Sequence, residues 1–177
     1  MKRNIIFLSL IVFFITAGIS YFVIEILYRH NLKESMNYLK DYSVSVVNSI
    51  APEIKTSFSK SDDIGLLYSI NKLSKLNNIT ESFILNKDLT VVIHNDSSKW
   101  NKKYSEPIYQ NAVSEQSGIT PLSNSAGFLY SIYIDDTNTL FAVISAQNIL
   151  TKLNGWKIKL YVFSFVLSLI FSFLMYY

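Results

Sequence analysis

Two long apolar runs, one at each end of the chain, constrain this sequence more than any other feature. Ile5–Ile24 is twenty residues long without a charge, and Ile158–Tyr177 is a second run of twenty with a single lysine. A helix needs roughly 20 apolar residues to cross about 30 Å of hydrocarbon, and each run reaches that length. We therefore expect transmembrane helices at 4–28 and 158–177, with residues 29–157 forming one domain on one side of a membrane.

Each run has a second interpretation. The first follows Lys2 and Arg3, as a signal-peptide segment does, but it exceeds the usual length of about 7–15 residues and no small-residue cleavage site follows it. The second run has the composition of a buried core helix. However, Trp156 before it and Tyr176 with Tyr177 after it are typical of the aromatic belts at membrane interfaces. We favour two uncleaved spans.

The orientation rests on the positive-inside rule. Lys2 and Arg3 make the short N-terminus positive and favour a cytoplasmic location for it. Basic residues also flank both spans on the other side, so charge counting alone does not decide. Long domains translocate largely regardless of charge, so we expect the middle domain on the outer side. The wealth of Asn, Ile, Lys, Ser and Tyr is typical of AT-rich bacterial coding DNA, which predicts the bacterial inner (cytoplasmic) membrane with a periplasmic domain.

The composition of the middle segment excludes several classes of function. Residues 29–157 carry 13 Lys/Arg against 12 Asp/Glu, so they are nearly neutral and lack the basic face that nucleic acid requires. The chain has no cysteine, which excludes disulfides and thiolate metal sites. A segment of about 130 residues suffices for one domain with its own core.

Helical periodicity opens the middle segment. From Arg29 to about Phe58 apolar residues recur at three- and four-residue steps, and Pro52 is expected to kink or restart this helix. The apolar stripe is wide enough to contact both the domain's own sheet and a second copy of the helix, although a stripe that only forms core is an equal alternative. Ser61-Asp62-Asp63 predicts the cap of a second helix at 62–76.

The period then changes to that of strands. A short helix from Ser105 to about Gln116 is expected to end at Gly118, and a break at Gly155 is expected between a helical link and the second span. Residues 123–127 are expected to form a loop. The predicted strands are two hairpins with a weak strand between them, namely Ile79–Leu85 with Leu89–His94, residues 119–122, and Phe128–Ile134 with Thr139–Ser145. The expected fold class is α+β.

This order between two spans resembles the extracytoplasmic PAS-like sensor domains called Cache or PDC domains, found in sensor histidine kinases, diguanylate cyclases and chemotaxis receptors. The stretch 83–96, FILNKDLTVVIHND, is similar to the strand–turn–strand of that family, and 128–145 is similar to its closing hairpin. Leu89 and Trp100 stand where the family often has glycine. The resemblance implies a PAS-like antiparallel sheet with a long N-terminal helix, flanked by two transmembrane helices.

The resemblance also implies a function. It predicts the small-molecule-sensing module of a bacterial transmembrane receptor, with a pocket between the sheet and residues 95–120 and a ligand that shifts the second membrane helix relative to the first. It further implies a homodimer in which the long first helices pair. An output enzyme would belong to a longer protein beyond Tyr177. Because these residues hold no output domain, a second expectation stays open: a membrane-anchored interaction protein whose domain docks a protein partner without a small ligand.

The residues themselves give no sign of catalysis. No Asp, Glu and His set has the spacing of a metal site, and no nucleophile motif is present. Asp135-Asp136 is best explained as a turn pair, and Asp62-Asp63 by helix capping. We therefore expect no enzyme activity, cofactor or metal within these residues.

Strand alternation suggests where a ligand would bind. In the last hairpin Phe128, Tyr130, Ile132 and Ile134 share an apolar face that should pack on the long helix, and Ser131 and Tyr133 lie on the other face. The same alternation places His94 with Thr90 and Val92. A loop lysine beside a neutral histidine would suit a carboxylate or an amino acid, although each residue taken singly also fits an ordinary solvated or core position. The predicted ligand-binding set is His94, Lys99, Trp100, Tyr104, Ser131 and Tyr133.

Overall fold

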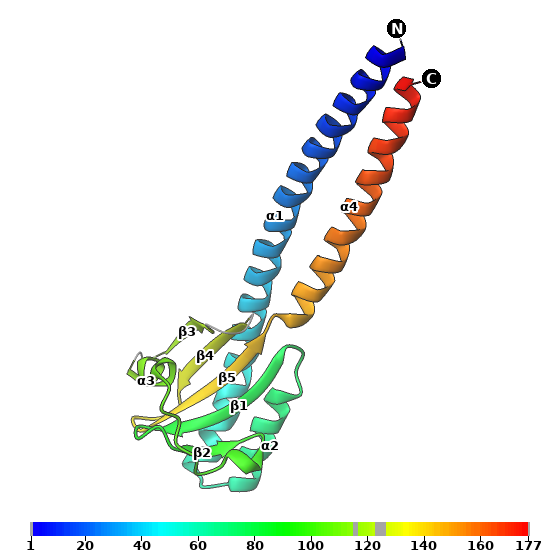
Figure 1. Ribbon diagram of the computed structural model, residues 1–177. Helices are drawn as coiled ribbons and strands as arrows, with labels where there is room; N and C mark the ends of the chain where they lie inside the picture. The colour runs from blue at the N-terminus through cyan, green and yellow to red at the C-terminus, as the bar shows by residue number, and fades with distance from the viewer. Residues whose placement is uncertain (1, 115–116, 123–126, 177) are drawn as a thin grey trace. The chain divides into compact units, whose positions relative to one another are not determined.

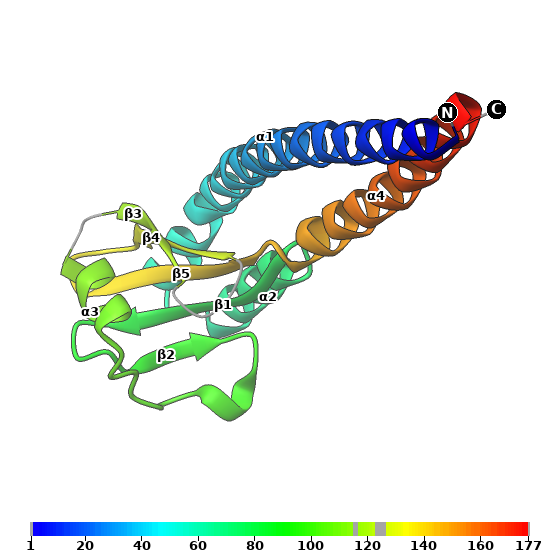
Figure 2. The same ribbon diagram turned by 45° about the horizontal axis from the view of Figure 1, so that its top comes forward.

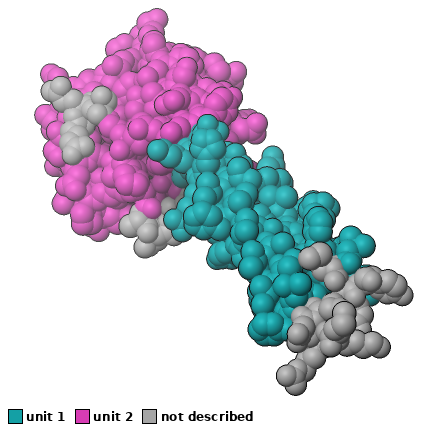
Figure 3. All heavy atoms as spheres, turned by 90° about the horizontal axis from the view of Figure 1, so that it is seen from above, with its two compact units in different colours: residues 1–36, 149–177 teal, residues 37–148 magenta. Residues whose placement is uncertain are grey.

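The computed structural model describes residues 2–114, 117–122 and 127–176. The chain divides into two compact units, residues 1–36 with 149–177 and residues 37–148, which Figure 3 shows in teal and magenta. The predicted order of helices and strands is confirmed (Figure 1). The elements are α1 (Lys2–Ser59), α2 (Asp63–Ser74), β1 (Ile79–Asn86), β2 (Val91–His94), the 3-10 turn η1 (Ser97–Lys99), α3 (Pro107–Ser114), β3 (Ser117–Pro121), β4 (Gly127–Tyr133), β5 (Asn138–Ser145) and α4 (Gln147–Tyr176).

The first unit consists of the N-terminal part of α1 and most of α4, which run antiparallel beside each other (Figures 1 and 2). Each helix is long and apolar enough to cross a membrane. Only 6% of the most apolar window of either helix is buried inside the protein, so neither window is a core segment of a folded domain. Apolar side chains such as Phe14, Phe22 and Phe163 are mostly exposed.

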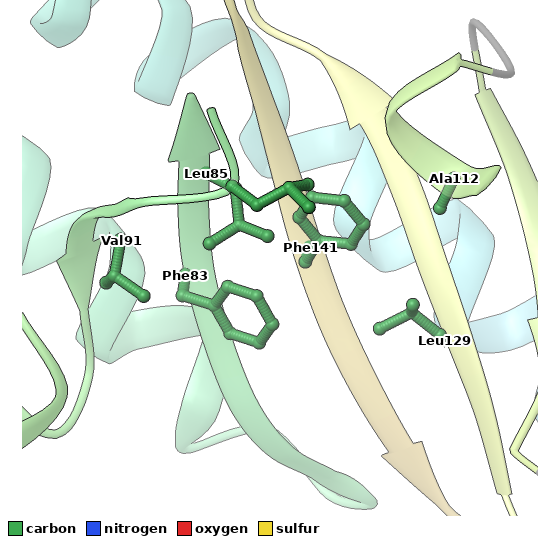
Figure 4. Packing of buried hydrophobic residues seen from close by; sticks show 7 residues of the cluster. Phe83, Leu85, Val91, Ala112, Leu129 and Phe141 are labelled. Atoms are coloured by element: carbon green, nitrogen blue, oxygen red, sulfur yellow. The ribbon is translucent and has the colours of Figure 1, made fainter. Parts of the chain in front are cut away.

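The second unit is built on a five-stranded antiparallel sheet with the order β2-β1-β5-β4-β3 (Figure 2). One face packs against α3 through Phe83, Phe141 and Leu129, as Figure 4 shows. Phe83 and Phe141 pair across β1 and β5, stack at 5.4 Å and are fully buried. Each buried ring of this kind contributes about 2–3 kcal/mol to folding.

The opposite face of the sheet packs against helices. The Ser82 hydroxyl donates to the Ile70 carbonyl of α2 at 2.7 Å, and Tyr130 donates to the Asn48 side chain of α1 at 2.9 Å. Within the predicted apolar face of β4, Tyr130 therefore does contact the long helix.

Local side-chain hydrogen bonds explain where elements begin and turn. Asp62 caps α2, as predicted, by accepting from the Gly65 amide at 2.9 Å. The Asn86 side chain accepts from the amides of Asp88 and Thr90, which closes the turn between β1 and β2. Asp135 accepts from the Thr137 amide at 2.7 Å and shapes the predicted turn between β4 and β5.

Two predictions about breaks are wrong, and a third is wrong in one of its two forms. Of the kink or restart expected at Pro52, the restart does not occur, because α1 runs from Lys2 to Ser59 as one helix, with Ala51 and Ile54 buried beside Pro52. Gly118 does not end a helix but pairs with Ser131 in the sheet. Gly155 lies inside α4. Gln116 and most of the predicted loop at 123–127 lie outside the described residues, and Gly127 begins β4.

We predict that Gly127→Ala destabilises the domain by about 1–3 kcal/mol, as overpacking does. A Cβ there would lie 2.2 Å from the Ile144 carbonyl oxygen, and backbone cannot move aside as a side chain can. Gly155→Ala is the matched control, because a Cβ at that helical position meets nothing within 4 Å. Thermal unfolding of the full chain in detergent, followed by circular dichroism, measures both. Equal midpoints for the two variants would contradict the close approach.

Candidate functional site

His94 is the centre of a small polar cluster on the α3 side of the sheet. The register between β1 and β2 shifts after Ile84, so that His94 pairs with Phe83 and Val91 pairs with Leu85. His94 therefore shares a face with Val91, and its predicted grouping with Thr90 and Val92 is wrong. Its ring is fully buried and stacks on Phe83 at 5.0 Å.

The imidazole holds the loop that follows β2. Its Nδ1 accepts from the Asp96 amide at 2.8 Å, which leaves the proton of the neutral ring on Nε2. Nε2 lies 3.4 Å from Oε2 of Glu81, and the Trp100 indole donates to the His94 carbonyl at 2.8 Å. Two residues of the loop are thus bonded to one buried side chain and its backbone.

Glu81 joins the cluster from β1. Its Oε1 accepts from the Lys99 ammonium at 2.7 Å, while Oε2 faces His94. The neighbouring His94 imidazole, together with the Lys99 ammonium, lowers the pKa of Glu81 to about 2 and outweighs the opposing effect of burial. Glu81 is therefore a carboxylate at any physiological pH, and it already neutralises the lysine that was expected to meet a ligand.

Tyrosines of the loop and of α3 cover the aromatic side of this cluster. The rings of Tyr104 and Tyr109 both pack edge-to-face with Phe83, with ring centres 5.4 and 5.9 Å from that of Phe83. The centres of the two tyrosine rings are 5.0 Å apart. Burial raises the pKa of Tyr104, and it raises that of Tyr109 to about 12, so both remain neutral phenols.

The structure brings together four of the six predicted ligand-binding residues. His94, Lys99 and Trp100 belong to the polar cluster, and Tyr104 reaches it through Phe83. The other two bond to the scaffold: Tyr133 donates to the Val113 carbonyl at 2.7 Å, and Ser131 to the Gly118 carbonyl at 3.4 Å. These two hydroxyls tie β4 to α3 and β3.

An open pocket of about 330 Å³ lies between the turn from β1 to β2 and helix α3. Its donors are the exposed side chains of Lys87, Lys103 and Gln110, and the exposed Asp88 carboxylate also lines it. Neither lysine forms an ion pair with any residue in the described part of the chain. The pocket can therefore offer positive charge to an anion. Its lining is Lys87, Asp88, Leu89, Lys103, Gln110 and Val113.

Sequence reasoning missed Glu81 and the residues that line this pocket, although the resemblance implied a pocket between the sheet and residues 95–120. Glu81 stands two positions before Phe83, so strand alternation already places its side chain on the face that His94 shares. The signal was that Glu81 is the single charged residue of strand β1. The pocket had no such signal, because it joins a turn to a helix about twenty residues away in sequence. No group of three or more His and carboxylate side chains within residues 2–114, 117–122 and 127–176 could hold a metal ion.

Comparison with known proteins does not assign the chain to a family. No protein-family model matches the sequence, and no curated protein matches it significantly.

Replacing Glu81 with Gln should lower the thermal stability of the protein at pH 7. In acid the replacement should no longer change the stability. The folded-state pKa of Glu81 lies below its unfolded value of about 4.5, so its contribution is present above pH 4.5 and disappears as the pH falls towards 2. The thermal midpoints of the parent and E81Q should therefore differ at pH 7 and converge near pH 2–3. Glu106→Gln, at an exposed position before α3, is the control. A difference between parent and E81Q that is independent of pH would refute the ionic role.

Proposed function

We propose that this chain is the extracytoplasmic sensing module of a bacterial transmembrane receptor, with a PAS-like domain of the Cache kind between two membrane spans. The domain binds a small carboxylate or amino acid and transmits its ligand state to α4. The location is the inner membrane, with the domain on the periplasmic side, and the module works as a homodimer. The chemistry of the domain is binding, not catalysis.

One observation carries this proposal. An α+β unit, residues 37–148, lies in sequence between two helices whose apolar windows are almost wholly exposed. Exposed apolar surface of this extent is costly in water and favourable in a bilayer. A folded domain joined at both ends to such helices suits the reception of a signal at a membrane.

The turn between β1 and β2 supports the Cache resemblance. Leu89 stands where that family usually has glycine, and its φ is +62°, in the left-handed region that favours glycine. The Leu89 side chain is buried in the cluster around Phe83 and Phe141, which offsets the strain. The backbone geometry of a glycine turn is thus kept by a residue that also fills the core.

The open pocket is the better place for a carboxylate. Lys99 and His94 face Glu81, so a ligand there would have to displace a bonded carboxylate. Lys87 and Lys103 have no such partner in the described part of the chain, and Gln110 adds a neutral donor. We assign the ligand contacts to this pocket. We assign to His94, Lys99 and Trp100 the role of holding the neighbouring loop that follows β2.

A second function, docking of a protein partner, is favoured by a different surface. Ile64 and Tyr68 of α2 are 85% and 65% exposed, and Tyr38 and Tyr42 of α1 stack on each other at 6.2 Å while exposed. Exposed aromatic and aliphatic side chains on neighbouring turns are typical of protein interfaces.

Thermal-shift screening of the full chain in detergent against small carboxylates, amino acids, amines and nucleobases tests the sensor proposal. A ligand at 100 times its Kd stabilises the folded state by about 2.7 kcal/mol, which moves the midpoint by roughly 5–10 °C. We expect a carboxylate or an amino acid to give such a shift. A well-folded protein that no compound moves would support docking of a protein partner instead.

Variants of the pocket then locate the site. Lys103→Ala should abolish the ligand shift while the protein without ligand unfolds at the parent's temperature, because Lys103 is exposed and its charge is unpaired within the described part of the chain. Lys102→Ala changes the adjacent exposed lysine, which is outside the pocket lining, and should keep the full shift. Equal losses in both variants would show a general charge effect and not a site.

A further inference from the structure

The two apolar helices of the first unit carry a group of polar side chains that face each other. Glu25 lies within the segment 4–28 that was predicted to span the membrane, where a charged side chain is costly unless it is paired. Its carboxylate pairs with the Lys157 ammonium of α4 and also accepts from the Tyr161 hydroxyl at 2.6 Å. Lys157 and Tyr161 are one helical turn apart, so a single turn of α4 supplies both donors.

The next turn of α1 adds a second set of contacts. The Tyr28 hydroxyl donates to the Asn154 side chain at 2.8 Å, and the Lys157 ammonium lies 4.4 Å from the centre of the Tyr28 ring. On the other side of Glu25, Tyr21 stacks on Tyr161 at 5.5 Å. Residues on two turns of α1 and two turns of α4 thus form one connected network.

The remaining contact between the helices is mostly apolar. An open apolar groove of about 470 Å³ lies between them, lined by residues such as Val23, Leu27 and Phe163. Contacts of this kind do little to fix how far one helix slides along another, because lipid tails solvate apolar side chains equally well. Directional contacts to an ion pair do fix it, since a slide of one turn would leave both charges without partners.

We propose that Glu25, Tyr28, Asn154, Lys157 and Tyr161 form a polar clasp that fixes the register of α4 against α1. The Glu25–Lys157 pair is its central part, and movement of α4 along α1 must break it. This proposal rests on the membrane placement and on the signalling role of α4 in the proposed function. It adds the residues that resist this movement.

Disulfide crosslinking in native membranes tests the clasp. The chain has no cysteine, so two cysteines introduced in place of Ser9 and Ser172 can form a disulfide within the chain only with each other. The Ser172 hydroxyl donates to the Ser9 carbonyl at 3.0 Å, so this pair is close in the clasped register, about four turns from Glu25 along α1. A pair at Ser9 and Ser168 reports a slide of one turn. We expect fast crosslinking of 9 with 172 and slow crosslinking of 9 with 168.

Glu25→Gln should slow crosslinking of 9 with 172 by roughly tenfold, a size typical of coupling between contacting residues, and speed that of 9 with 168. The reversed pair Glu25→Lys with Lys157→Glu should restore the first rate to within about threefold, because the same attraction is rebuilt. Glu34→Gln is the matched control on α1, since the ion-pair partner of Glu34 is His30 of the same helix.

Three results would overturn the proposal. They are no crosslinking of 9 with 172 in the parent, an unchanged rate in E25Q, or no recovery in a reversed pair that is present in the membrane fraction. If the reversed pair does not accumulate, Glu25→Asp decides, because it keeps the carboxylate and should keep the parent rate. The assay uses no ligand, so a failed ligand screen leaves it standing. Conversely, loss of the protein from the membrane fraction would count against the proposed function.

Discussion

The apolar side chains that cover the outside of α1 and α4 are the constraint on which the other features depend. These helices bury almost none of their apolar windows inside the protein, so the hydrophobic effect acts between them and their surroundings and not within a core. A bilayer satisfies that demand. The polar groups of the pair gather at Glu25 and Lys157, where one carboxylate meets an ammonium and a phenol.

Residues 37–148, which lie between the two apolar segments in sequence, form a unit with a hydrophobic core of its own. Phe83 and Phe141 stack across the two central strands, and His94 extends the same stack towards the edge strand. The site grows from that arrangement, because the buried imidazole accepts from the Asp96 amide through Nδ1, while its Nε2 faces Glu81 at 3.4 Å and has no hydrogen-bond partner within the described part of the chain. These contacts hold the loop, while Lys87 and Lys103, which form no ion pair within the described residues, lie on the neighbouring turn and loop.

Local patterns predicted the fold well and the site only in part. Period changes and capping residues such as Asp62 identify the α-helices and strands of the described residues, since these signals depend on near neighbours, but not the short 3-10 turn η1. The restart considered at Pro52 and the break expected at Gly155 do not occur, because packing and long-range polar contacts override local preference. The register shift beside His94 and the use of Tyr133 to bond α3 depend on partners distant in sequence, so no local pattern reveals them.

Cysteine labelling in intact cells tests most directly the claim that a folded outer domain is held between two spans. Lys102→Cys is exposed in the domain, and Phe14→Cys is 69% exposed on the apolar part of α1. An impermeant maleimide should label position 102 in intact cells and should leave position 14 unlabelled even after lysis, because hydrocarbon excludes water and thiolate. Labelling of position 102 only after lysis, or ready labelling of position 14, would contradict the account.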